Sequence, residues 1–112
     1  MSFELKNTPN ATIFKVTAER LDSTIAPDAK AELNDIAAKG VKNIIVDISA
    51  VKYCDSSGLS VILVANRLCK LAGGKMVISG PNEFVHKLIC ISQLDSILKI
   101  SPSLDEALKV FL

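Results

Sequence analysis

The sequence has few aromatic residues and no tryptophan: rings make up 4% of its 112 residues, whereas 49% are hydrophobic. A core therefore has to be built from Val, Ile, Leu and Ala, a composition typical of sheets covered by helices. A chain of this length is one ordinary domain and buries about two-thirds of the surface that its unfolded form exposes. We therefore expect residues 1–112 to form a single domain whose core needs no stabilising cross-link.

The chain also lacks a dominant charge and a long hydrophobic run. Thirteen basic residues stand against twelve acidic ones, and no Lys/Arg cluster reaches the density of a nucleic-acid footprint. The longest apolar run, residues 61–65, is far shorter than the ~20 residues that span a bilayer. Residues 1–6 lack the apolar stretch of a secretory signal. We therefore expect a cytoplasmic protein that binds neither nucleic acid nor membrane.

Cysteine and histidine are scarce, and their spacing does not suggest a metal site. Cys54, Cys69 and Cys90 are odd in number and lie inside apolar stretches, which predicts buried free thiols in a reducing compartment. His86 is the only histidine, and it cannot complete a metal site with such scattered cysteines. We expect it to be a surface or half-buried helical residue rather than a catalytic base. The sequence thus predicts neither a metal nor a cofactor.

The hydrophobic pattern predicts an α/β fold. Alternating residues at 3–6 and 11–18 predict a β-hairpin, and the β-branched runs 43–48, 75–79 and 97–100 predict further strands. Helical spacing of apolar residues predicts four helices, over residues 27–40, 57–71, 82–91 and 103–112. After the opening hairpin, strands and helices alternate. The order predicts a single domain with a mixed sheet of about five strands and about four helices.

Polar residues at 55–58 join a buried strand to the longest predicted helix. Asp55, Ser56 and Ser57 are all good N-cap residues, and Gly58 allows a tight turn, so a helix start here presents free N–H groups at a loop tip. A phosphate on an exposed hydroxyl at this point would lie near the positive end of the helix dipole. Taken alone, the same four residues also fit an ordinary capped turn.

The position of this segment in the chain resembles that of a motif in a known protein family. Asp55-Ser56-Ser57-Gly58-Leu59 opens an apolar helix that ends in Gly73-Gly74-Lys75, and this closely resembles the signature of STAS-domain anti-sigma factor antagonists. The resemblance covers nearly the whole chain in the order and spacing of its elements, including Leu21-Asp22-Ser23-Thr24 after the second strand. Ala18 and Ser60 stand where glycine is common in the family, which leaves the choice of partner open.

The resemblance implies a phosphorylation switch. In this family the serine after the aspartate, here Ser56, is phosphorylated by a kinase that is also the anti-sigma factor. The unphosphorylated form binds the anti-sigma factor and frees the sigma factor for transcription, whereas the phosphorylated form releases it until a serine phosphatase acts. We expect the free protein to be a monomer. The residues implied to form the partner-binding surface are Asp22, Ser23, Thr24, Asp55, Ser57, Gly58, Leu59 and Ser60.

Two other functions compete with the switch. An enzyme would use Ser56 as a nucleophile, but the sequence has no G-x-S-x-G motif and no residue placed by motif to activate the hydroxyl. We therefore do not expect an enzyme. STAS domains also serve as accessory subunits of lipid-transport complexes and as scaffolds in signalling assemblies. Those relatives generally lack a usable phosphoserine motif, so the Asp-Ser-Ser-Gly segment favours the switch.

Overall fold

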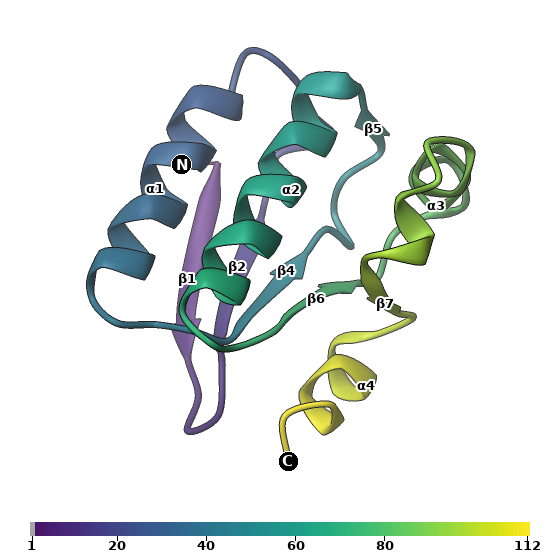
Figure 1. Ribbon diagram of the computed structural model, residues 1–112. Helices are drawn as coiled ribbons and strands as arrows, with labels where there is room; N and C mark the ends of the chain where they lie inside the picture. Colours follow the sequence, from purple (N-terminus) through teal and green to yellow (C-terminus); the bar gives the residue numbers. More distant parts are fainter. Residues whose placement is uncertain (1) are drawn as a thin grey trace.

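A five-stranded mixed sheet forms the centre of the computed structural model, which describes residues 2–112 (Figure 1). The strand order is β1-β2-β4-β6-β7; β1 pairs antiparallel with β2, and the other neighbours pair in parallel. The strands are β1 Phe3–Asn7, β2 Thr12–Val16, β4 Ile44–Asp47, β6 Met76–Ser79 and β7 Lys99–Ser101. The predicted hairpin and mixed sheet are confirmed.

Four α-helices accompany the sheet, as the sequence predicts. Figure 1 shows α1 and α2 side by side over one face, with α3 and α4 near the β6 and β7 side. Their bounds are α1 Ala26–Ala38, α2 Ser56–Leu71, α3 Glu83–Ile91 and α4 Leu104–Lys109. The last helix is shorter than expected, and β7 begins later than expected because a 3-10 turn, η1 Leu94–Ser96, follows α3.

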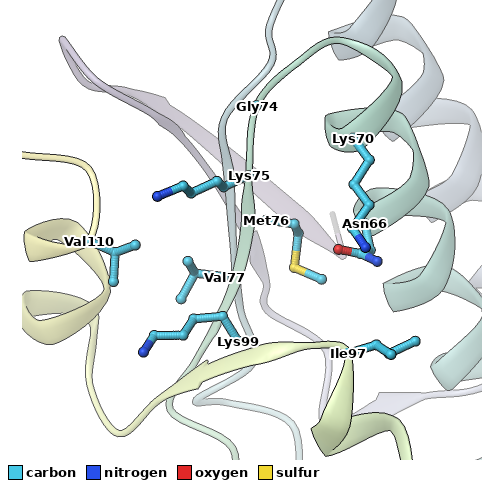
Figure 2. Close-up of a pocket in the computed structure, with 9 residues that line it drawn as sticks. All are labelled: Asn66, Lys70, Gly74, Lys75, Met76, Val77, Ile97, Lys99 and Val110. Carbon is cyan, nitrogen blue, oxygen red and sulfur yellow. The ribbon is translucent and has the colours of Figure 1, made fainter.

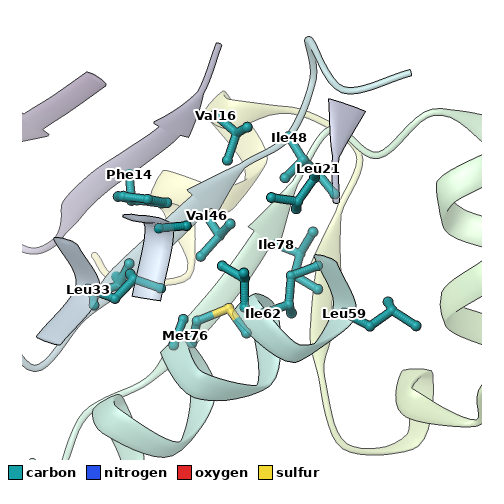
Figure 3. Close-up of a cluster of buried hydrophobic side chains, with 14 of the residues drawn as sticks. Phe14, Val16, Leu21, Leu33, Val46, Ile48, Leu59, Ile62, Met76 and Ile78 are labelled. Carbon is teal, nitrogen blue, oxygen red and sulfur yellow. The ribbon is translucent and has the colours of Figure 1, made fainter. Parts of the chain in front are cut away.

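The alternation of side chains along the parallel strands divides the core between the two faces of the sheet. On one face, Phe14, Val46 and Ile78 belong to the main cluster, which also takes in the buried side chains of α1 and α2 (Figure 3). The preceding residue of each strand points the other way and packs with α4; these residues are Ile13, Ile45 and Val77. Both faces of β4 are therefore covered, which explains its continuous β-branched run.

A second, two-stranded sheet lies beside the first and was not predicted. It consists of β3, Arg20–Leu21, and β5, Tyr53–Cys54, which run parallel with Leu21 opposite Cys54. Strands of two residues carry no periodicity, so the sequence pattern could not show them. Because β3 leads into Asp22 and β5 leads into Asp55, the pairing brings the two loops of interest together.

The ends of the elements follow the chemistry of their residues. Gly73 adopts a φ of 84° just after α2, a conformation that favours glycine and ends the helix. The Ser103 hydroxyl accepts a hydrogen bond from the backbone N–H of Glu106 at 3.2 Å and so caps the start of α4. No helix within residues 2–112 has both the length and the apolar character needed to cross a membrane.

The thiols differ in their burial. Cys54 and Cys69 are free and buried, as expected, but Cys90 is only half-buried on α3, so that part of the prediction is wrong. Removal from water raises the pKa of both buried thiols to about 11, and the charge of Asp55 adds to the effect at Cys54. These two cysteines are therefore core residues in their protonated form at neutral pH.

Candidate functional site

Asp55 is the N-cap of α2 and fixes the loop that precedes the helix. Its backbone is extended, with φ −120° and ψ −167°. One carboxylate oxygen, Oδ1, accepts hydrogen bonds from the backbone N–H of Ser57 at 2.9 Å and of Gly58 at 3.1 Å. Two of the four N–H groups that a helix start leaves free are thus satisfied by one side chain. Asp55, rather than either serine after it, caps the helix.

The two serines that follow the cap have different surroundings. Ser56, the first residue of α2, is exposed, whereas Ser57 is half-buried. Ser57 faces the start of α1, where it lines a hollow of about 280 Å³ together with Ser23 and Lys30. Within residues 2–112, neither hydroxyl has a hydrogen-bond partner. The more accessible hydroxyl of the pair is therefore that of Ser56.

The neighbouring loop is held by the carboxylate of Asp22. This side chain accepts hydrogen bonds from the backbone N–H and the hydroxyl of Thr24, and from Arg20 Nε at 3.1 Å. These bonds lower the pKa of Asp22 below its usual 3.8. The bonds from Thr24 have the largest effect, and the bond from Arg20 comes next. Asp22 is 8% exposed, so it shapes the loop from inside, while Ser23 and Thr24 are exposed at its tip.

Gly58 is needed for space rather than for a tight turn, so the expected reason for this glycine is wrong. Its φ does not lie in the left-handed region; the residue is part of α2. A Cβ added at Gly58 would overlap the carbonyl oxygen of Leu21 and lie 2.5 Å from Cys54 Sγ. The start of α2 therefore packs directly on β3 and β5, which locks the spacing between Ser56 and the Asp22 loop.

The structure brings the residues of the implied partner-binding surface together but does not expose all of them. Ser23 and Thr24 are exposed, Asp55, Ser57 and Ser60 are half-buried, and Asp22, Gly58 and Leu59 are buried. Buried members of the set contribute mainly by positioning the exposed ones. The accessible part is a polar patch formed by the tips of the two loops and the first turn of α2.

Three residues next to this patch escaped the sequence analysis. Arg20 Cζ lies 4.3 Å from the centroid of the Tyr53 ring, and Tyr53 stacks on Phe84 with ring centroids 5.8 Å apart. Because Arg20 also binds Asp22, the stack joins the Asp22 loop to α3. Phe84 remains 50% exposed. The three positions are 30 or more residues apart in the chain, so no local motif could have indicated the stack.

The remaining candidate residues do not form a second chemical centre with this patch. His86 is exposed on α3, with Nδ1 4.0 Å from Cys90 Sγ one turn later. In the part of the chain that the structure describes, no three His, Cys, Asp or Glu side chains gather in a way that could hold a metal ion. Asp47, buried at the end of β4, accepts a hydrogen bond from the backbone N–H of Ser49, as expected for a structural aspartate.

The hairpin-led mixed sheet and the capped serine loop define a small α/β domain of the STAS type. The chain belongs to the STAS domain family, whose model matches residues 2–107. It is 27% identical over 101 residues to the anti-sigma F factor antagonist of Paenibacillus polymyxa, a match that covers 89% of this chain and 86% of the relative.

Two further comparisons lead to Thermotoga proteins. The chain is 35% identical over 71 residues to the "Putative anti-sigma factor antagonist TM1081 homolog" of Thermotoga neapolitana, and the match spans only 63% of each protein. The crystal structure of the Thermotoga maritima protein tm1081, described in the same words, has a TM-score of 0.88 and 27% identity to this chain. That likeness covers 97% of this chain and 93% of the other. The relatives share a name that describes regulators rather than enzymes.

Proposed function

We propose that this chain is an anti-sigma factor antagonist whose binding to an anti-sigma factor serine kinase is switched off by phosphorylation of Ser56. The observation that carries the proposal is the exposed, unpaired hydroxyl of Ser56 at the first residue of α2. The names of the relatives supply the regulatory role. The chain acts by binding and release, with no catalytic step of its own, and a serine phosphatase returns it to the binding form.

The choice of Ser56 over Ser57 rests on access. In the kinase active site, the serine hydroxyl oxygen must reach the γ-phosphate of ATP. The serine side chain therefore has to be accessible on the surface of the domain. Ser56 is exposed, but Ser57 faces α1 in a hollow shared with Ser23 and Lys30, and its N–H is held by Asp55. Ser57 is therefore the less accessible of the two serines to a kinase.

The fold can accept a phosphate at Ser56. A phosphoserine carries roughly −1.5 to −2 charges at pH 7, and water together with the positive end of the α2 dipole stabilises it at an exposed first-turn position. Asp55 opposes the new charge, but its Oδ1 is already engaged with two backbone N–H groups. Nothing buried has to move, so the domain stays folded in both states.

A phosphate at Ser56, which the fold tolerates, would weaken the binding of a partner protein. A protein packed over the tips of the two loops would have to remove water from the phosphate, at a point already bordered by Asp55. The loss of about 3 kcal/mol of binding free energy weakens an affinity about a hundredfold. This is enough to exchange one partner for another without any change in the shape of the domain.

The test uses the wild-type chain, Ser56→Ala and the matched control Ser57→Ala, each incubated with ATP and the anti-sigma factor kinase. We expect one phosphate on the wild type and on Ser57→Ala, none on Ser56→Ala, and fragment mass spectra that locate it on Ser56. By isothermal titration calorimetry, Ser56→Ala should bind the kinase with wild-type affinity, and the phosphorylated chain about a hundredfold more weakly. Treatment with a serine phosphatase should restore binding. A phosphate found mainly on Ser57, or equal affinity of the two forms, would overturn the proposal.

A further inference from the structure

A cavity of about 430 Å³ opens at the far end of α2 from Ser56 (Figure 2). It lies where α2 ends, β6 and β7 begin and α4 passes over the sheet, and its lining includes Lys70, Met76, Ile97 and Val110. Because a helix of 16 residues is about 24 Å long, this cavity and the serine loop are separate places on the molecule.

The polar part of the cavity is entirely cationic or neutral. Lys70, Lys75 and Lys99 contribute to its lining, and among the lining residues that the structure describes none is acidic. None of these three lysines forms a salt bridge within residues 2–112, although Lys52, Lys87 and Lys109 elsewhere on the surface do. Three exposed ammonium groups thus surround one hollow with no counter-charge from the lining residues.

The rest of the lining is apolar. Figure 2 shows Lys75 and Lys99 extending to the same side of β6, with Val77 and Val110 between them. Val77 is fully buried beneath the cavity, whereas Ile97 at its side leaves 53% of its surface exposed. Large aliphatic side chains of this kind favour a ligand with an apolar part, which a bare inorganic ion does not have.

We propose that this cavity binds a small soluble organic anion, a phosphate or carboxylate group carried on an apolar body. The anionic group would lie between the ammonium groups of Lys75 and Lys99, and the body would cover Val110 on the same side of β6. The volume falls in the range of about 300 to 1,000 Å³ that is typical of small-molecule sites. An adjoining hollow shares Lys75 and Val110 with the cavity and adds Lys42 to its lining. The proposal does not depend on phosphorylation of Ser56.

The test is a titration of the isotope-labelled chain with hexyl phosphate, followed by backbone amide chemical shifts. We expect saturable shifts centred on residues 75–77, 97–99 and 110. Inorganic phosphate has the charge without the body, and 1-hexanol has the body without the charge, so each should bind at least about tenfold more weakly. The double variant Lys75→Gln/Lys99→Gln should lose about tenfold in affinity for hexyl phosphate.

The matched control is Lys39→Gln, which removes an exposed lysine from the end of α1, outside the cavity, and should bind hexyl phosphate as the wild type does. Equal affinity for inorganic and hexyl phosphate, shifts centred elsewhere, or an undiminished affinity of the double variant would each overturn the proposal. A lipid source is tested separately by sedimentation with phosphatidylcholine vesicles that contain phosphatidic acid. If the wild type co-sediments with these vesicles and Lys75→Gln/Lys99→Gln does not, the cavity binds a membrane surface, and the proposal of a soluble ligand is wrong.

Discussion

The carbonyl oxygen of Leu21 occupies the space that a Cβ on Gly58 would need, so the start of α2 can pass β3 only without a side chain at this position. Alanine favours helices over glycine by about 1 kcal/mol, but here its methyl group would force the packed segments apart. We expect Gly58→Ala to lower the free energy of unfolding by roughly 1 to 3 kcal/mol in urea denaturation. The half-buried Ser60, on the same turn, supplies the control: Ser60→Ala should change stability by no more than about 0.5 kcal/mol. A Gly58→Ala chain as stable as the wild type would contradict this packing.

The cap of α2 gives a second prediction. Asp55→Ala removes the oxygen that accepts the N–H groups of Ser57 and Gly58, and should lower the free energy of unfolding by about 0.5 to 2 kcal/mol. Asp55→Asn keeps an acceptor at the same place and should recover most of the loss, which thermal or urea denaturation can measure. Equal losses in the two variants would mean that the charge of Asp55, rather than its hydrogen bonds, stabilises the helix start.

Phosphorylation should leave the fold unchanged. Because Ser56 is exposed and no buried group has to move, amide shift changes between the two forms should be confined to residues 20–25 and 54–62. Ser56→Asp, with a single charge and a different shape, should mimic only part of the loss of partner binding. Shift changes that spread through β4, β6 and α4 would show instead that the domain rearranges.

The thiols should react at very different rates. Burial raises the pKa of Cys54 and Cys69 to about 11, so almost no thiolate is present at neutral pH, and access is blocked as well. In the native chain we expect one thiol per molecule to react readily with dithionitrobenzoate, and all three after unfolding. Cys90→Ser should remove the fast reaction. A second fast thiol in the native protein would show that the core around α2 opens readily.

Asp22 should contribute to the acid sensitivity of the fold. Its pKa is lower in the folded chain than in the unfolded one, chiefly through its bonds with Thr24, so the folded state favours the ionised form. That stabilisation is complete above the unfolded pKa and is lost as the pH falls through the folded pKa. The free energy of unfolding of Asp22→Asn should therefore decline less steeply than that of the wild type between about pH 5 and pH 2. Parallel profiles would show that the Asp22 bonds are absent in solution.

Local sequence patterns predicted the elements well because each has a strong periodicity or a clear end signal. The hairpin alternates, β4 and β6 are β-branched, and Gly73 and Ser103 mark a helix end and a helix start. The last helix was predicted too long because its apolar spacing continues through Phe111, although the helix ends at Lys109.

What the sequence could not show depends on contacts between distant segments. The β3–β5 pairing rests on two residues in each strand, and the Arg20–Tyr53–Phe84 stack joins three separate segments. The lysines of the cavity come from α2, the start of β6 and β7, and none of them belongs to a charged cluster in the sequence. Even Gly58, singled out correctly as special, owes its identity to the carbonyl of Leu21 rather than to its neighbours in the chain.

The small β3–β5 sheet holds the loops that follow β3 and β5 at a fixed separation, so their sequences can be exchanged between related proteins. Its pairing uses main-chain groups, which are the same in almost every sequence, and so it sets the separation of the loops independently of the side chains at their tips. An exposed residue such as Ser23, whose side chain does not hold the loop, can therefore vary without shifting one loop against the other. Two proteins of this family could trade partner preference by trading only these short segments, while the sheet, the helices and the core beneath them remain as they are.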